Sequence, residues 1–562
     1  MIGVVVNSSE HVVVCEFFEL FKTPWEFYRS DGQYDVLLCS EDGPIQENPA
    51  PLVLIYGDRK LPYDVENGID IASQQNTRML SYRGTEIPIY GGSVVFHTPG
   101  SAVLVDRDSH QPAIHLEQST GRTVARIGYD LFREVRTLLT VGQPAINAGI
   151  PALELHIAIL RDLIVASGVP LVEVPPVPHG YKFIACLTHD VDHPSIRKHK
   201  FDHTMLGFLY RAIIGSVVSL FRGRLSMRGL RSNWVAALKL PFVHLGLARD
   251  FWFDFERYPK LERGIRSSFF IIPFKNRAGR NERGPAPCRR ASRYSASEIA
   301  AQIQTLMCAG CEIGLHGIDA WVDASKGREE LEEIRRITGS NAIGVRMHWL
   351  YFGEQSAGIL EKAGADYDST VGYRETVGYR AGTTQAYKPL EASQLLELPL
   401  HVMDTALFYP CYLNLSPAEA SERVARIIDN AIRFGGGVIV NWHDRSIAPE
   451  RLWGNSYLRL INELKHRGAW FATAAETVAW FRKRRSATFN ASSCGSGSLH
   501  IDPALAGLTL PALRLRVHAP AEVKGKLTEL PIFADTTLPA AYASGRATGG
   551  ETCDHRLVDR AA

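Results

Sequence analysis

Two carboxylates spaced two residues apart follow an apolar run and have the chemistry for metal binding or acid–base catalysis. The run 183–187 predicts a buried β-strand, and Asp190 and Asp192 follow at its carboxyl end. Side chains at positions i and i+2 of an extended chain point to the same side, so the two carboxylates should lie together. His189 and His193 flank them and add imidazole, a second kind of metal ligand. We therefore interpret this segment as part of a functional site rather than a solvated turn.

Four later segments place polar side chains after predicted strands in the same way. The polar residues are His316, Arg346, the segment Asp366-Tyr-Asp-Ser-Thr370, and His443. The carboxyl ends of parallel strands meet at one face of a barrel, which is where α/β enzymes carry their active sites. We therefore expect these side chains to converge with Asp190 and Asp192.

The elements that position these residues predict an α/β domain over residues 179–485. Its predicted strands are 182–188, 267–273, 311–316, 342–347, 366–370, 396–400 and 437–442. Ser295-Ala-Ser-Glu298 and Ser416-Pro-Ala-Glu419 have the spacing of capping boxes at helix starts, and Thr473 begins a last helix. Seven strands alternating with helices predict a distorted parallel (β/α)7-type barrel.

Three further regions flank or interrupt this barrel. Residues 1–178 predict an N-terminal α/β accessory domain, in which 12–14 is read as a strand and 128–168 as helical. Residues 194–260 predict a helical insertion between the first two barrel strands. Residues 486–562 are rich in Ser, Gly, Ala, Thr and Pro and predict a β-like or flexible C-terminal appendage.

Composition indicates a globular protein of several domains. The 562 residues are 45% hydrophobic and 22% charged, and a net charge of +2 provides no overall field for nucleic acid, which we exclude as a partner. Nine cysteines without framework spacing indicate a reducing compartment. The N-terminus has neither a basic region nor a long apolar stretch, which argues against a secretory signal. We therefore expect a cytoplasmic protein.

The longest apolar stretch, 204–221, is interrupted by Arg211 and flanked by basic residues. Two interpretations fit it. The segment 197–231 is either a peripheral contact on an anionic membrane face, or a buried helix or helical hairpin that covers the barrel. We prefer the buried helix.

The order of the motifs resembles the polysaccharide deacetylase family, also called the NodB-homology or carbohydrate esterase 4 group. The similarity covers roughly residues 180–484. The motifs are Thr188-His-Asp-Val-Asp192, Gly314-Leu-His316, Val345-Arg346, Asp368-Ser-Thr370 and Trp442-His443. The motif Thr-His-Asp-Val-Asp-His and the extra N-terminal domain are typical of a long branch of that family.

This resemblance implies a metal-dependent hydrolase that removes acetyl groups from glycans, usually with zinc. By the resemblance, Asp190 is the general base and Arg346 orients it. Asp192 and His316 are metal ligands, and His443 protonates the leaving amine. A metal held by carboxylate and imidazole lowers the pKa of a bound water, which fits these roles.

The sequence departs from the family pattern at two positions. Ala320 stands where the family has a second histidine, four residues after His316, and His348 replaces the proline of the arginine motif. His348 is our preferred third ligand because it lies at an adjacent strand end near Arg346, with Asp319 and His193 as alternatives. A carboxylate ligand makes the site tolerant of Mn²⁺, Co²⁺ or Ni²⁺ as well as Zn²⁺. Trp349 and Trp442 follow strand ends and either bind substrate or pack in the barrel.

The leading hypothesis is the removal of acetyl groups, N-acetyl groups foremost, from a glycan or lipid-linked oligosaccharide. The reaction would belong to exopolysaccharide or other cell-surface polysaccharide biosynthesis. The protein would then work in the cytoplasm or peripherally at the inner membrane face. A small-molecule amidohydrolase and a catalytically inactive, glycan-binding scaffold are the alternatives. A scaffold has no chemical need for an acid–base pair, so the retention of Asp190 and His443 argues against it.

Overall fold

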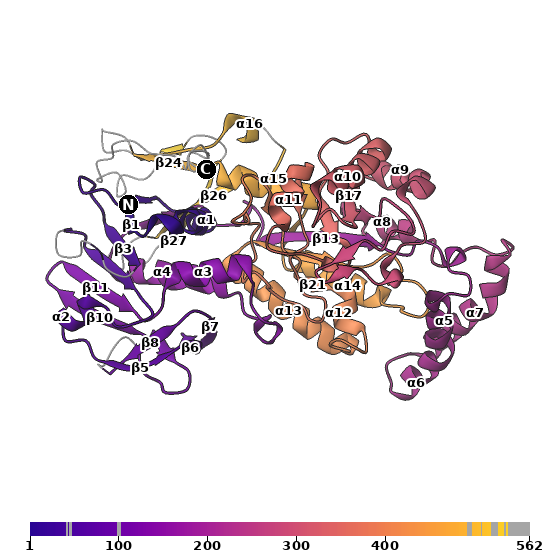
Figure 1. Cartoon of the computed structure of the whole chain (residues 1–562), viewed down its shortest axis with the longest axis horizontal. Helices are drawn as coiled ribbons and strands as arrows, with labels where there is room; N and C mark the ends of the chain where they lie inside the picture. Colours follow the sequence, from indigo (N-terminus) through magenta and orange to yellow (C-terminus); the bar gives the residue numbers. More distant parts are fainter. Residues whose placement is uncertain are drawn as a thin grey trace. The chain divides into compact units, whose positions relative to one another are not determined.

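The computed structural model divides the chain into two compact units (Figure 1). Unit 1 comprises Met1–Gly180, Tyr379–Leu390 and Ala479–Ala562, and unit 2 comprises Tyr181–Gly378 and Glu391–Val478. The residues that the structure describes are 1–40, 43, 48–97, 103–491, 497–506, 509–518, 527–532 and 536–537. Much of the predicted appendage 486–562 therefore lies outside the described residues.

Unit 1 contains a six-stranded sheet, and helices precede or follow its strands in the chain. The strand order is β10 (Ile114–Ser119), β11 (Arg122–Ile127), β4 (Leu52–Tyr56), β3 (Val36–Ser40), β1 (Ile2–Val5) and β2 (Trp25–Phe27). Helices α3 (Leu131–Thr140) and α4 (Ala152–Ala166) lie in the region predicted to be helical. The strand predicted at 12–14 is wrong, because these residues lie in helix α1 (His11–Phe21). Val14, Phe17 and Phe21 are buried there at helical spacing.

Described strands of the C-terminal region belong to unit 1. Strand β26 (Leu513–His518) pairs antiparallel with β12 (Leu171–Glu173) and with β27 (Leu527–Ile532). The buried Glu173 carboxylate forms ion pairs with Arg161, Arg516 and His518 at 2.8, 3.2 and 3.0 Å. These charges lower the pKa of Glu173 although burial alone would raise it. The C-terminal strands are thus tied to the N-terminal region by both backbone and charge.

The cysteines that the structure describes differ in state. Cys186 and Cys311 are buried free thiols, and Cys15 in α1 is disulfide-bonded.

Unit 2 is built on a curled, nine-stranded parallel sheet, which confirms the predicted α/β class and distorted barrel. The path runs β20 (Leu396–Glu397), β19 (Tyr367–Asp368), β18 (Val345–Met347), β17 (Glu312–Gly317), β14 (Ser268–Ile271), β13 (Phe183–Val191), β22 (Gly437–Asn441) and β21 (Val402–Met403), with β23 (Ala469–Phe471) paired to β13. All nine residues of β13 are buried, as the apolar run predicts for a central strand. The short strands β21 and β23 were not predicted.

Two of the three predicted helix starts are present. Ser416 and Glu419 form a reciprocal capping box at the start of α13 (Pro417–Phe434), and Thr473 and Glu476 do the same before α15 (Ala474–Arg485). The capping box predicted at Ser295 is wrong. Its side chain caps nothing, and a 3₁₀ turn, η7 (Ala296–Ile299), precedes α9 (Ala300–Cys308). The Glu298 carboxylate instead binds Lys198 at 2.8 Å.

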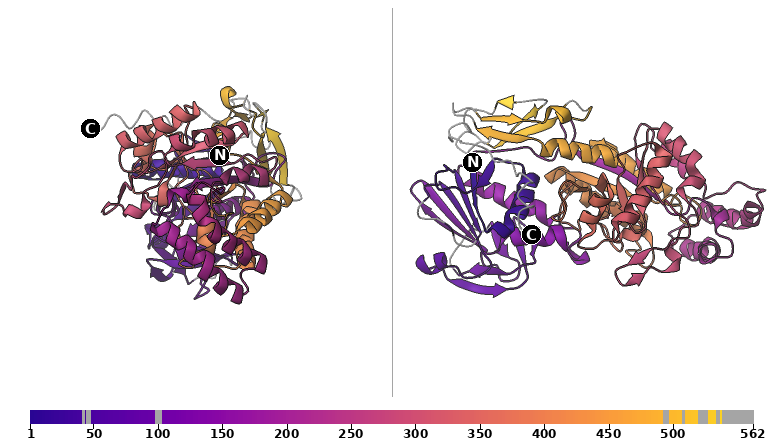
Figure 2. Two further views of the ribbon diagram at one scale, coloured as in Figure 1. Left: turned by 90° about the vertical axis from the view of Figure 1, so that its right-hand side faces the viewer. Right: turned by 45° about the horizontal axis from the view of Figure 1, so that its top comes forward.

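The helical insertion forms a hairpin at one end of unit 2, away from strands β13 and β17 (Figures 1 and 2). Its elements are α5 (His203–Tyr210), a π-helical turn η4 (Arg211–Gly215), α6 (Ser216–Phe221) and α7 (Met227–His244). The continuous helix His203–Phe221 is long and apolar enough, by length and composition, to cross a membrane. Only 28% of its apolar window is buried, so the segment is not a buried helix. The predicted alternative form, a helical hairpin, is present.

Candidate metal and acid–base site

Strand β13 carries Asp190 into a polar cluster at the carboxyl ends of the sheet. One carboxylate oxygen of Asp190 accepts a hydrogen bond from the Asn441 side chain at 2.7 Å, and the other accepts from Arg346 at 3.2 Å. Asn441 ends the neighbouring strand β22, and its side-chain oxygen also accepts the Asp190 backbone N–H at 3.2 Å. The Asp190 carboxylate is therefore held in one orientation by two adjacent strands.

Arg346 of β18 is fully buried and bound on every side. Its guanidinium donates to the Ser369 carbonyl at 2.9 Å, to the Ser369 hydroxyl at 2.8 Å and to the Thr188 hydroxyl at 2.5 Å. It also lies over the ring of Phe270, 4.5 Å from the centroid. Ser369 follows β19 within the Asp368-Ser-Thr370 motif, so that motif holds the arginine that in turn holds Asp190.

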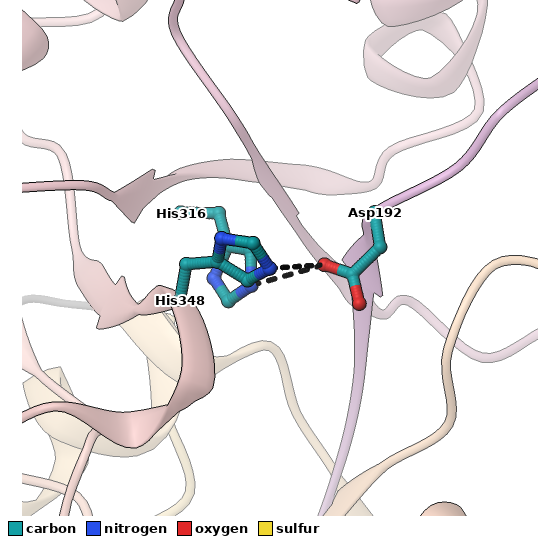
Figure 3. Close-up of side chains that lie close together, drawn as sticks. All are labelled: Asp192, His316 and His348. Atoms are coloured by element: carbon teal, nitrogen blue, oxygen red, sulfur yellow. Dashed lines mark ion pairs between the residues drawn. The ribbon is translucent and has the colours of Figure 1, made fainter. Parts of the chain in front are cut away.

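Three residues from three strand ends form a potential metal site (Figure 3). The Asp192 carboxylate oxygen Oδ1 lies 3.3 Å from His316 Nε2 and 3.5 Å from His348 Nε2. The three ligand atoms lie within 4.8 Å of one another. Asp192 follows β13, His316 is in β17, and His348 begins the turn η8 (His348–Leu350) after β18.

The donor set fits a divalent cation. The Arg346 carbonyl accepts a hydrogen bond from His316 Nδ1 at 2.9 Å, which leaves the Nε2 lone pair facing Asp192. Burial holds the pKa of His348 well below its usual value, so this imidazole is neutral and able to ligate. The Asp192 Oδ1 atom is buried yet accepts no hydrogen bond from any described residue. A buried carboxylate oxygen without a donor is the state expected of a metal ligand.

Arg290 supports His348 from behind and was missed by the sequence reasoning. It donates to the His348 carbonyl at 2.7 Å and to the Ile318 carbonyl at 3.0 Å. Arg290 lies in a turn with no motif or periodic pattern, so no sequence signal pointed to it. It fixes the loops after β17 and β18 relative to each other, and with them the two histidines.

His443 follows β22 and is bound by a second carboxylate that was also missed. Its Nδ1 lies 2.6 Å from Asp404, and its backbone N–H donates to the same carboxylate at 2.7 Å. Its Nε2 lies 3.8 Å from Asp192. Burial opposes protonation of His443, but Asp404, Asp192 and Asp190 raise its pKa to about 10. His443 is therefore a cation at neutral pH.

Asp444, the residue directly after His443, does not bind the imidazole. Asp444 accepts hydrogen bonds from the backbone N–H groups of His193 and Arg445, at 3.0 and 2.9 Å. Asp404 takes the orienting role at the start of α12 (Asp404–Phe408), directly after β21. A carboxylate directly after a strand could have identified Asp404 in the sequence, but β21 has only two residues and is too short to predict.

Three polar residues that the sequence placed near the site lie elsewhere. His189 is buried in the core, with Nε2 2.9 Å from Glu262 and Nδ1 2.8 Å from the Trp442 carbonyl. His193 Nδ1 lies 3.1 Å from His199, and the Asp319 carboxylate binds Lys326 at 3.0 Å. Neither alternative third ligand joins Asp192 and His316.

The two predicted substrate-contacting tryptophans differ. Trp442 is 1% exposed and packs against Tyr457 and Phe408, which favours packing in the barrel over a substrate contact. Trp349 is half-buried, with its ring 5.9 Å from that of His348 and a left-handed backbone at φ +65°. A substrate contact at Trp349 stays a prediction.

Comparison with known proteins yields distant structural neighbours. No family model and no curated sequence matches the chain. Among solved structures it is similar to a candidate polysaccharide deacetylase from Mycobacterium smegmatis, at a TM-score of 0.34 and 18% identity, over 55% of this chain and 95% of that one. It is also similar to a CE4 family pseudoenzyme from Bacillus anthracis, at 0.26 and 12%, over 54% and 69% of the two chains. A mutant of the pseudoenzyme with restored enzymatic activity matches at 0.25 and 12%, over 54% and 71%. Similarities of this size assign no function, which has to be inferred from the site itself.

Proposed function

We propose that this chain is a metal-dependent hydrolase that removes acetyl groups, N-acetyl groups foremost, from a glycan or lipid-linked sugar. The observation that carries the proposal is the convergence of Asp192, His316 and His348 around a buried carboxylate oxygen that lacks a hydrogen-bond donor. An acid–base pair, Asp190 and His443, lies within 4 Å of this cluster. The resemblance of the motifs to polysaccharide deacetylases supplies the reaction.

Asp192, His316 and His348 would hold the cation. One carboxylate and two imidazoles suit Zn²⁺, and Mn²⁺, Co²⁺ or Ni²⁺ are alternatives. When bound, such a cation would lower the pKa of a water molecule and polarise the acetyl carbonyl.

Asp190 would accept the proton of the attacking water. Asn441 and Arg346 each donate to a different oxygen of this carboxylate, so its orientation costs nothing at the moment of reaction. The Arg346 guanidinium, 3.2 Å away, also places a positive charge beside this carboxylate.

His443 would donate the proton that the leaving amine needs when the C–N bond breaks. Asp404 keeps the imidazole protonated at neutral pH and fixes the ring through Nδ1, which leaves the proton on Nε2 available on the Asp192 side. Asp404 thus keeps the acid in the protonated form that the reaction requires.

The substrate and the location rest on the motif resemblance. We place the reaction in cell-surface polysaccharide biosynthesis, on a substrate presented in the cytoplasm or at the inner membrane face. A small-molecule amidohydrolase would use the same residues, and a panel of substrates distinguishes the two.

The test is acetate release by the full-length, metal-loaded protein from N-acetylated and O-acetylated oligosaccharides and from small amides. Asp190→Asn should lower the rate by about 10²- to 10⁴-fold while the protein retains its metal. Asp319→Asn, which changes a nearby carboxylate outside the cluster, is the matched control and should keep the wild-type rate. Glycan binding without acetate release, insensitive to a chelator and to Asp190→Asn, would overturn the proposal in favour of a binding scaffold.

A further inference from the structure

The helical hairpin of unit 2 exposes apolar side chains in a regular stripe on each of its helices. On His203–Phe221 the exposed side chains are Leu206, Tyr210, Ile213, Ile214, Val218 and Phe221. On α7 they are Met227, Trp234, Val235, Leu238 and Phe242, and Leu245 follows the end of the helix. Spacings of three, four or seven residues keep each set on one face of its helix.

The other face of each helix is already used. Phe208 and Ala212 from the first helix pack with Ala236 and Leu240 from α7 in a buried cluster that also contains Trp252. The stripes are therefore additional to the apolar surface that holds the hairpin together. Exposed apolar area of this extent marks a site of interaction with a partner or a membrane.

The excess of basic residues in the hairpin indicates which kind of partner it binds. Residues 194–249 contain ten lysines and arginines and a single acidic residue, Asp202. Of the basic side chains, Lys200, Arg222, Arg228, Arg231 and Lys239 are exposed and form no ion pair with a carboxylate in the described part of the chain. Apolar side chains among unpaired cations match a bilayer that carries anionic phospholipid.

A cavity beside α7 has the same charge. It has a volume of about 730 Å³, and its lining includes Arg228, Arg231 and Lys239 from α7 together with Arg249 and Arg257. Three carboxylates also line it. Asp254 pairs with Arg249 and Arg257 at 3.3 and 3.9 Å, whereas Asp250 and Asp444 accept hydrogen bonds from nearby backbone N–H groups. The three cations from α7 are thus left to meet the phosphate of a lipid headgroup.

We propose that this hairpin docks the protein on an anionic lipid bilayer, with both apolar stripes in the interface and the basic residues among the headgroups. The hairpin lies on the bilayer and does not cross it. One face of His203–Phe221 is packed in the protein core, and Arg211 in its middle pairs with Glu450 at 3.8 Å. A spanning helix would have to give up both contacts and bury Arg211 in hydrocarbon.

Docking also bears on the substrate, and this step rests on the proposed function. Asp444 lines the cavity and directly follows His443, so the headgroup region and the acid–base site share one loop. This shared loop favours a substrate in which the sugar is joined to a lipid through phosphate.

The test is flotation of the full-length protein with vesicles of phosphatidylcholine alone or mixed with phosphatidylglycerol. The wild type should float with the mixed vesicles and much less with phosphatidylcholine alone, and salt should weaken but not abolish binding. Leu238→Glu with Phe242→Glu, at side chains 75% and 53% exposed, should reduce the bound fraction by about tenfold or more. Val65→Glu with Ile146→Glu, 66% and 91% exposed in unit 1, makes the same change of charge elsewhere and should float like the wild type.

A second readout does not depend on a variant folding. Trp234 is 46% exposed, and the other eight tryptophans are half-buried or buried, so lipids with brominated acyl chains should quench Trp234 fluorescence in the wild type and not in Trp234→Phe. A wild type that stays unbound with anionic vesicles, or a hairpin variant that floats as well as the control, would overturn the proposal. The proposal would also be overturned if the wild type binds no lipid but forms a dimer, and the hairpin variant is a monomer. Metal content and acetate release from soluble substrates should be unchanged in the hairpin variant, so failure here is distinguishable from failure of the proposed function.

Discussion

His443 and Asp404 form the contact that sets the pH dependence of the proposed reaction. His443 acts as an acid, so activity should fall as pH rises through its pKa, which the neighbouring carboxylates raise to about 10. Removing the Asp404 charge lowers that pKa toward the ordinary value for histidine, about 6.5. Asp404→Asn should therefore move the basic limb of the kcat–pH profile to lower pH. A bound cation would lower the pKa in both proteins without changing their order.

The control for this prediction is Asp444→Asn, which removes a neighbouring carboxylate that binds backbone N–H groups and not the imidazole. Its basic limb should stay near that of the wild type. A basic limb in Asp404→Asn at the wild-type pH would contradict the role given to Asp404.

Arg346 makes a geometric contribution that lysine cannot replace. Its guanidinium binds Ser369, Thr188 and Asp190 at once, and an ammonium group cannot span all three. Arg346→Lys should lower kcat by about tenfold to a hundredfold with little change in metal content, because Asp190 loses its orientation. The exposed substitution Arg336→Lys is the control. Loss of metal together with activity in Arg346→Lys would point instead to collapse of the cluster.

At the scale of residues, the sequence predicts on which side of a strand each side chain lies, provided that the strand itself can be recognised. Asp190 and Asp192 share a side because they are two residues apart, whereas His189, one residue earlier, points to the opposite side and meets Glu262. His348 was expected from its place beside Arg346 at a strand end. Arg290 and Asp404 were missed because they come from a turn and a two-residue strand, which leave no periodic pattern.

At the scale of elements, the two predicted capping boxes at Ser295 and Ser416 provide a matched pair. The Ser416 hydroxyl accepts the Glu419 N–H at 3.3 Å, but the Ser295 side chain caps no helix. Ser416→Ala should lower the free energy of unfolding by about 1 kcal/mol, and Ser295→Ala should change it by only a few tenths of that. Urea denaturation of the two variants measures both values. Equal losses would show that the cap at α13 contributes no stability of its own.

The elements that were misread share a cause. The segment 12–14 is a run of three valines, which favours a strand locally, but burial at the spacing of Val14, Phe17 and Phe21 makes the longer segment a helix. Glu298 follows Ser295 at capping-box spacing but is drawn to Lys198 and Lys275, and the first turn becomes 3₁₀. In both cases packing or charge from distant residues overrides a local pattern.

At the scale of the whole molecule, the alternation of strands and helices was sufficient to predict the barrel and the convergence of its polar strand ends. Burial of the hairpin was not predictable in the same way. Its helices are apolar on both faces, and composition alone does not distinguish a surface that packs on the barrel from one that remains exposed. Only the structure shows which face of each helix packs against the rest of unit 2 and which face is exposed.

The measurement that tests the central claim most directly is metal content by plasma mass spectrometry. The full-length protein is purified as wild type, His316→Ala and His348→Ala, each after incubation with Zn²⁺ and removal of the excess. His193→Ala is the control, because His193 lies beside Asp192 in sequence but contacts His199. We predict close to one metal ion per wild-type and control chain and a metal content lower by about tenfold or more in each of the other two variants. A wild-type protein that binds no transition metal, or a His348→Ala variant that binds it as tightly as the control, would contradict the site described by Asp192, His316 and His348.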